Sequence, residues 1–310
     1  MDSIKRFLSA DGFVRIILAE TTDTVEQARK LHDTTPVATA ALGRTLTATV
    51  MLASELKADG SVTATIYGDG PLGRVCAVAR PDGTVKAYVS NPALELPVRA
   101  DGKLDVSGAV GGQGKLTVVK DLGMREPWVG QVNLISGEIG MDFAQYLTAS
   151  EQQNSLVALG VLIAKDLTVA AAGGIIVQPM PGCPEQTITL LEQKAPALAD
   201  ISRRLHEEGG EALIASVFGD MSPLKVGETP VQYRCDCSRE RIEQVLITLG
   251  AEELRDMAEQ DGGAEVCCHF CNVAYLFNVE ELLGLAVEPL PDCNPLPNPS
   301  PEGGGEVRYK

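Results

Sequence analysis

The sequence predicts an α+β protein: an N-terminal α/β core with a mainly antiparallel sheet and packed helices, then a helical linker and a small C-terminal four-cysteine domain. Turn residues between alternating apolar runs favour antiparallel strands in the first 180 residues. Apolar residues then recur at helical spacing up to residue 230, and four cysteines follow between 235 and 271. With 310 residues, 45% of them hydrophobic, the chain is long enough for about two domains.

The core is expected to begin with a strand over residues 13–19 and a helix over 25–32, for which the threonines at 22 and 24 offer caps. Pro36 is placed to open a longer helix that runs to Leu56, because proline suits the first helical turn. Further strands are expected over residues 61–67, 74–80, 84–90, 116–119 and 129–134, with a hairpin turn at 81–83.

Residues 141–164 are expected to be helical, with a break near 148–151. The most apolar stretch, 156–177, is interpreted as a buried helix followed by a strand. Lys165 and Asp166 split it, so it falls short of the ~20 apolar residues of a membrane span.

The charge balance limits the partners of the protein. Lys and Arg total 26 against 42 Asp and Glu, a formal net charge of −16. Binding to nucleic acid or to an anionic membrane needs a cationic surface, so neither is expected as a partner. Asp2, Lys5, Arg6 and Asp11 interrupt any apolar run that could serve as a secretory signal. We therefore expect a cytoplasmic protein.

A helical linker is predicted over residues 181–230. Its apolar positions fall into two stripes that need a surface to pack on. Either these helices form an ordinary packed subdomain or they form a connector that can detach. The stripes comprise Ile188, Leu191, Leu198, Ile201 and Leu205, and then Leu213, Ile214, Val217 and Phe218.

The C-terminal domain is predicted over residues 231–288. Ser238 can cap a helix whose apolar residues Ile242, Val245, Leu246 and Leu249 share one face, and Gly250 can end it. From Pro289 onward, prolines and consecutive glycines predict a disordered tail over 289–310.

Four cysteines form the strongest signal in the sequence. Cys235 and Cys237 are separated by 30 residues from the pair Cys268 and Cys271. Two short-spaced pairs can supply four thiolates at tetrahedral corners, as structural Zn²⁺ requires. His269 could replace one of the cysteines as a ligand, but its place between two cysteines favours a spacer role. Cys267 is the alternative to Cys268 as a ligand.

The charge of this domain indicates what the metal is for. Residues 232–288 contain four Arg and no Lys, against twelve Asp or Glu. A nucleic-acid-binding zinc module needs a basic face, which this composition cannot build. The expected role of zinc is structural or regulatory.

The segment Cys235–Arg241 (CDCSRER), followed by Cys268–Asn272 (CHFCN), resembles the heat shock protein 33 family of redox-regulated chaperones. The resemblance extends to Gly111–Asp121, Tyr146–Gln152 and Ala172–Gln178 in the core. Cys267, Cys183 and the proline-rich tail with Cys293 depart from the pattern of that family.

The resemblance implies an ATP-independent holdase that protects thermally unfolding and oxidatively damaged proteins from aggregation. It implies that the reduced protein binds one zinc ion through Cys235, Cys237, Cys268 and Cys271 and is inactive. Oxidation would form the disulfides Cys235–Cys237 and Cys268–Cys271, release zinc and unfold the linker. The active form would bind unfolding clients, as a homodimer, in the stress response to oxidants.

Two other functions fit the cysteines. A thiol–disulfide exchange enzyme could use Cys268 and Cys271, although such motifs usually open a helix, and this pair precedes the strand-like residues 273–277. A zinc-stabilised adaptor could bind partners without switching. Gly108–Lys115 does not match a phosphate-binding loop, since Ala109 and Leu116 stand where that motif needs Gly and Ser or Thr. We expect no enzymatic activity and assign no catalytic residue.

Overall fold

The computed structural model describes residues 1–57 and 59–286, so the predicted tail and Cys293 lie outside the described residues. It confirms the predicted α+β class with mainly antiparallel sheets. The chain divides into two compact units. The first comprises Met1–Cys235 with His269–Asn272, and the second comprises Asp236–Cys268 with the described residues from Val273 onward.

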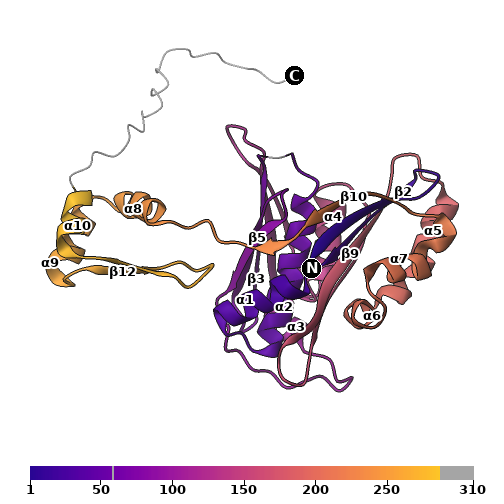
Figure 1. Ribbon diagram of the computed structural model, residues 1–310, viewed down its shortest axis with the longest axis horizontal. Helices are drawn as coiled ribbons and strands as arrows, with labels where there is room; N and C mark the ends of the chain where they lie inside the picture. Colours follow the sequence, from indigo (N-terminus) through magenta and orange to yellow (C-terminus); the bar gives the residue numbers. More distant parts are fainter. Residues whose placement is uncertain (58, 287–310) are drawn as a thin grey trace, which may run out of the picture. The chain divides into compact units, whose positions relative to one another are not determined.

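The first sheet has five strands in the order β10-β1-β2-β9-β8, each antiparallel to its neighbours (Figure 1). Its central strand pair is buried on both faces, because helices cover both sides. The strands are β1 (Ser3–Leu8), β2 (Val14–Glu20), β8 (Leu156–Ile163), β9 (Val169–Pro179) and β10 (Leu224–Pro230).

The second sheet has six strands in the order β11-β5-β4-β3-β6-β7. β11 runs parallel to β5, and the other neighbours are antiparallel. The predicted hairpin at 81–83 is present, and Gly83 has the positive φ of 83° that its turn requires. The strands are β3 (Ser61–Gly68), β4 (Arg74–Ala79), β5 (Thr84–Val89), β6 (Gly114–Asp121), β7 (Trp128–Asn133) and β11 (Gln232–Tyr233).

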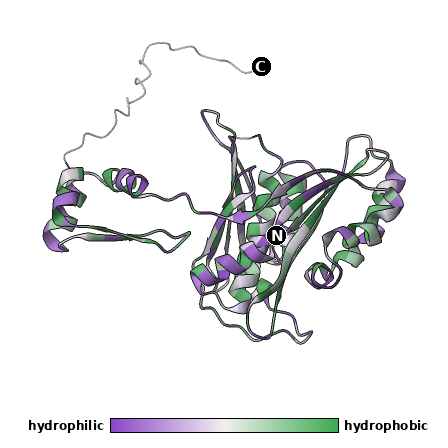
Figure 2. Cartoon of the chain, in the orientation of Figure 1, coloured by the Kyte–Doolittle hydropathy of each residue, from purple (hydrophilic) through white to green (hydrophobic). Residues whose placement is uncertain are grey.

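Helix α2 (Pro36–Ala53) packs between the two sheets and is buried nearly all round. Figure 2 colours each residue of the chain by its hydropathy. Thr45 and Thr49 are tolerated in α2 because their hydroxyls form hydrogen bonds within the helix. Thr45 Oγ1 donates to Ala41 O at 2.9 Å, and Thr49 Oγ1 donates to Thr45 O at 2.6 Å. The other core helices are α1 (Thr22–His32), α3 (Val106–Val110) and α4 (Gly140–Ala149).

The start of α1 is capped by a residue that the sequence analysis did not consider. The buried carboxylate of Asp2 accepts hydrogen bonds from Thr24 N at 2.6 Å and from Asp23 N at 3.2 Å. The threonine caps proposed from the sequence are therefore wrong, since no side-chain cap bond forms at the helix N-cap. Burial raises the pKa of Asp2, against its bonds to Thr24.

The helix expected over residues 141–164 is confirmed up to its predicted break near 148–151, but the part after the break is wrong, since residues 156–163 form a strand. Helix α4 ends at Ala149, and β8 and β9 form an antiparallel hairpin with a turn in which Leu167 has φ 68°. A buried apolar run suits a helix or a strand equally by periodicity, so the pairing of β8 with β9 decided the outcome. Strand β1 was not predicted, and β10 lies where the linker was expected to be helical.

The predicted linker helices are confirmed up to Met221. We call residues 185–221 the connector, whose helices mix hydrophobic and hydrophilic residues (Figure 2). Its apolar stripes pack on the face of the first sheet that points away from α2. The connector comprises α5 (Glu185–Lys194), the 3₁₀ turn η1 (Ala195–Leu198), α6 (Ile201–Glu208), α7 (Gly210–Phe218) and the 3₁₀ turn η2 (Gly219–Met221).

The second unit has a small core built on Leu246, Leu254, Phe277 and Leu282. The helix predicted after Ser238 is confirmed, but Gly250 leads directly into a further helix. Its elements are α8 (Arg239–Ile247), α9 (Ala251–Gln260), β12 (Ala264–Cys267), β13 (Ala274–Phe277) and α10 (Val279–Leu285). Among the described residues, no helix combines the length and apolarity of a membrane span.

Candidate metal centre

The first cysteine pair lies between β11 and α8. Ser238, directly after Cys237, accepts a hydrogen bond from Arg241 N at 3.3 Å and so starts the helix. The Tyr275 hydroxyl donates to Cys237 Sγ at 3.2 Å. A donor aimed at sulfur stabilises the thiolate over the thiol, which favours a metal ligand.

The second pair lies on the turn that joins β12 to β13. Cys268 N donates to Val273 O at 3.0 Å and closes the turn. Asn272 adopts a left-handed φ of 56°, which asparagine tolerates better than most residues. The turn brings Cys268 and Cys271 to one side of the hairpin end.

These four residues form the group that can hold a metal ion. The sulfurs of Cys235, Cys237, Cys268 and Cys271 all lie within 4.8 Å of one another. Four thiolates at ~2.3 Å from one zinc ion would be about 3.8 Å apart. The donor set and its spacing therefore fit a tetrahedral zinc ion, as the sequence spacing predicted.

Cys267 does not belong to this group. It is exposed, and its Sγ donates to Glu265 Oε1 at 3.6 Å. Partial desolvation and the Glu265 carboxylate raise the pKa of Cys267, so it is a poor thiolate. Cys268, its neighbour in sequence, is buried within the group.

The loop between Cys268 and Cys271 packs within the first unit. The ring of Phe270 meets the edge of Tyr88 with centroids 5.2 Å apart, and Lys86 Nζ lies 4.9 Å from its centre. The His269 ring lies 5.5 Å from Tyr88, and His269 is not part of the four-cysteine group. Asn272 Nδ2 donates to Leu31 O at 2.7 Å.

Tyr233 contacts the loop between Cys268 and Cys271, and this residue was not predicted from the sequence. Its hydroxyl donates to Ala87 O at 2.8 Å and lies within hydrogen-bond reach of Phe270 O and of His32 Nε2. Burial lowers the pKa of His32, which keeps its ring neutral. Only the apolar-polar alternation of Val231–Tyr233 before Cys235 could have indicated an inward tyrosine.

The arginines beside the cysteines pair with carboxylates. Arg241 Nη1 lies 2.6 Å from Asp236 Oδ2, and Arg239 Nη2 lies 2.7 Å from Glu281 Oε1. Arg239 also covers the Phe277 ring at 4.3 Å. These contacts hold α8 against β13 and α10 and so stabilise the second unit.

Comparisons with known proteins point to a single family. The family model described as Hsp33 protein matches residues 2–278. The 33 kDa chaperonin of Bacillus subtilis (strain 168) is 48% identical over 287 residues, 92% of this chain and 98% of that protein. The 33 kDa chaperonin of Geobacillus kaustophilus (strain HTA426) is 46% identical over 283 residues, 91% of this chain and 96% of that protein.

A solved structure agrees. The crystal structure of the 33 kDa chaperonin (heat shock protein 33 homolog) from Thermotoga maritima matches with a TM-score of 0.84 at 38% identity. The match covers 92% of this chain and 97% of that one. The similarity therefore includes both the sheets and the cysteine-bearing residues.

Proposed function

This chain belongs to the Hsp33 family, and from that premise we propose that it is an ATP-independent chaperone that oxidation switches on. It would hold thermally or oxidatively unfolding proteins in the cytoplasm and prevent their aggregation. The observation that carries the proposal is the group of four cysteine sulfurs that lie within 4.8 Å of one another.

We propose that Cys235, Cys237, Cys268 and Cys271 bind one zinc ion in the reduced protein. When bound, zinc supplies folding free energy, ~10–16 kcal/mol in small zinc modules. Among the described residues, the core cluster of the second unit has six buried apolar residues, and cores of this kind rarely supply more than ~3–5 kcal/mol. Its fold should therefore depend on the metal.

Oxidation would remove the ligands. One thiolate of a pair attacks peroxide and becomes a sulfenic acid, with loss of hydroxide. The second thiolate attacks that sulfur, a disulfide forms, and a second hydroxide leaves. Two electrons per pair thus reduce one peroxide to two waters after protonation. The pairs Cys235–Cys237 and Cys268–Cys271 would form, and their sulfurs could no longer bind metal.

The surface exposed by the switch would be the one that the connector covers. The outer face of the first sheet is apolar at Phe7, Val14, Ile16, Ile175 and Val177. Buried apolar side chains of α5, α6 and α7 pack on it, so detachment of the connector would expose both surfaces. Unfolding clients, which expose apolar segments, would bind there. We propose that the oxidised form is a homodimer.

The proposal is tested by diluting a chemically unfolded client into the protein without ATP and recording light scattering. One sample is reduced and zinc-loaded, and the other is treated with peroxide at mildly elevated temperature. We expect only the oxidised sample to suppress aggregation of the client. Equal suppression by both would indicate a constitutive zinc-stabilised adaptor. If neither suppresses, turnover of insulin reduction tests the alternative of a thiol–disulfide exchange enzyme.

A further inference from the structure

The first turn of connector helix α6 lies on two glycines of the first sheet. Gly160 in β8 and Gly173 in β9 are direct partners in the antiparallel register. Directly paired residues project to the same face of a sheet. Both glycines are buried, and together they leave a shallow notch in the face that the connector covers.

The notch is filled by α6 itself. A Cβ added to Gly160 would lie 2.8 Å from Ser202 Cβ, 2.9 Å from Ser202 N and 2.9 Å from Ser202 Oγ. A Cβ added to Gly173 would lie 2.5 Å from Leu205 Cδ1. Ser202 and Leu205 are three residues apart, so they share one helix face. The helix backbone thus approaches the sheet more closely than any side chain at Gly160 would allow.

Space, and not backbone conformation, is what these glycines provide. Neither has the positive φ that favours glycine. The next residue, Gly174, faces the other way, since its added Cβ would meet Leu159 and Met51 on the α2 side. Gly160 is the better position to test, because the three atoms nearest to its added Cβ all belong to Ser202. A Cβ added to Gly173 would also lie 2.4 Å from Ala19 O, within the sheet.

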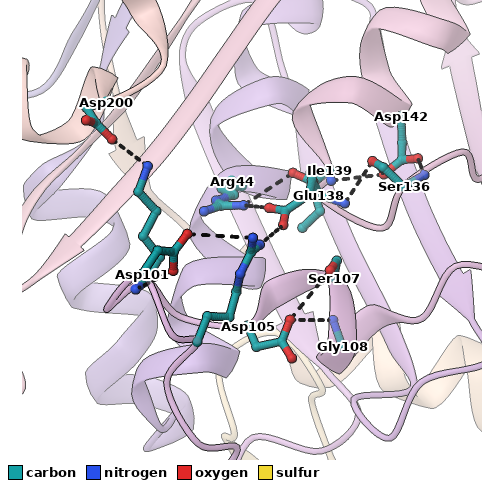
Figure 3. Close-up of polar contacts among 12 residues, drawn as sticks. Arg44, Asp101, Asp105, Ser107, Gly108, Ser136, Glu138, Ile139, Asp142 and Asp200 are labelled. Atoms are coloured by element: carbon teal, nitrogen blue, oxygen red, sulfur yellow. Dashed lines mark hydrogen bonds and ion pairs between the residues drawn. The ribbon is translucent and has the colours of Figure 1, made fainter.

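An ion pair lies at the N-terminal end of the first turn of α6. Lys103 Nζ contacts Asp200 Oδ1, the residue before α6, at 2.7 Å (Figure 3). Ile201 and Leu205 then place their side chains in the apolar layer under the connector. Electrostatic, apolar and steric contacts therefore meet within one helical turn, the first of α6.

We propose that Gly160 and Gly173 are positioning residues that seat α6 and thereby hold the connector closed over the client-binding face. This inference rests on the proposed function. A methyl group at Gly160 would lift α6 without touching a cysteine or the small core of the second unit. The closed state would weaken, and the reduced protein would bind clients with its metal retained.

The test is Gly160→Ala, with Gly227→Ala as the matched control. Gly227 lies in β10 of the same sheet, and its added Cβ meets only Arg6 Nη1 at an ordinary 3.4 Å. Overpacking of this kind should raise amide hydrogen exchange in residues 201–218 about 10- to 100-fold. Exchange in the second unit and zinc content should not change. The control should match the unsubstituted protein.

A second variant approaches the seat from the connector, in case Gly160→Ala disturbs the sheet. Ser202→Leu places a larger side chain over Gly160 and leaves the sheet intact, and His206→Leu changes an exposed position of the same helix as control. Faster amide hydrogen exchange in α6 of Ser202→Leu, with exchange in His206→Leu unaffected, supports the proposal that the two glycines position α6. Unchanged exchange in both Gly160→Ala and Ser202→Leu would overturn it.

Aggregation suppression by the reduced variants separates this inference from the proposed function. Fast amide exchange in α6 together with suppression of client aggregation supports both the positioning role of the glycines and the proposed function. Fast amide exchange in α6 without suppression of aggregation supports the positioning role of the glycines. It contradicts the assignment of the covered face as the client-binding surface.

Discussion

Replacement of Phe218 by alanine tests whether the connector keeps the reduced protein inactive by covering the client-binding face of the first sheet. Phe218 ends α7 and is 1% exposed in the apolar layer between the connector and the first sheet. Truncation of a buried phenylalanine to alanine costs ~3–5 kcal/mol. The connector is an outer layer, and such layers open at less than the global free energy of unfolding. The loss should therefore favour the open connector by about two to four orders of magnitude.

Phe143 offers a matched control. It is also 1% exposed, but it lies in α4 within the main core between the two sheets. Phe143→Ala should cost a similar amount of stability, and that cost should fall on global unfolding. We expect a lower thermal midpoint without an open connector.

The assay compares both variants, reduced and zinc-loaded, in suppression of client aggregation. Limited proteolysis within residues 185–221 reports whether the connector is open, and thiol titration reports that the cysteines stay reduced. We expect Phe218→Ala to suppress aggregation without oxidant and Phe143→Ala to remain inactive. Activity in both would mean that general destabilisation is sufficient. An open connector in inactive Phe218→Ala protein would refute the reasoning.

Three further predictions follow from particular residues. Cys268→Ser should weaken zinc binding far more than Cys267→Ser, since only Cys268 lies in the four-sulfur group; equal losses in a competition titration would contradict this ligand set. Removal of metal by a chelator under reducing conditions should increase amide exchange throughout α8, α9 and α10 while the sheets of the first unit stay protected. The hydrogen bond from Arg29 lowers the pKa of Glu26 from 4.5 to about 2. Its carboxylate therefore stabilises the fold above pH 4.5 and loses this effect as the pH falls towards 2, so Glu26→Gln should reduce the acid dependence of urea unfolding in this range.

The candidate site was largely predictable from the sequence, because its information is local. Two short-spaced cysteine pairs restrict the chemistry to a few metals, and the structure brings their sulfurs within 4.8 Å. Tyr233 and the Phe270 contacts were not predictable, since they depend on β11 pairing with the edge of the second sheet. Nothing in the local sequence states which edge that is.

The sequence by itself determined the α+β class, the helical connector with its two apolar stripes, and the cysteine pairs, because each follows from residue spacing within one segment. Only the tertiary structure decided that residues 156–163 form a strand and that β10 pairs with β1, more than 200 positions away in the sequence. It also decided that α6 rests on Gly160 and Gly173. Such contacts depend on long-range pairing and on space between elements, and a glycine in the sequence does not show which element will fill the space beside it.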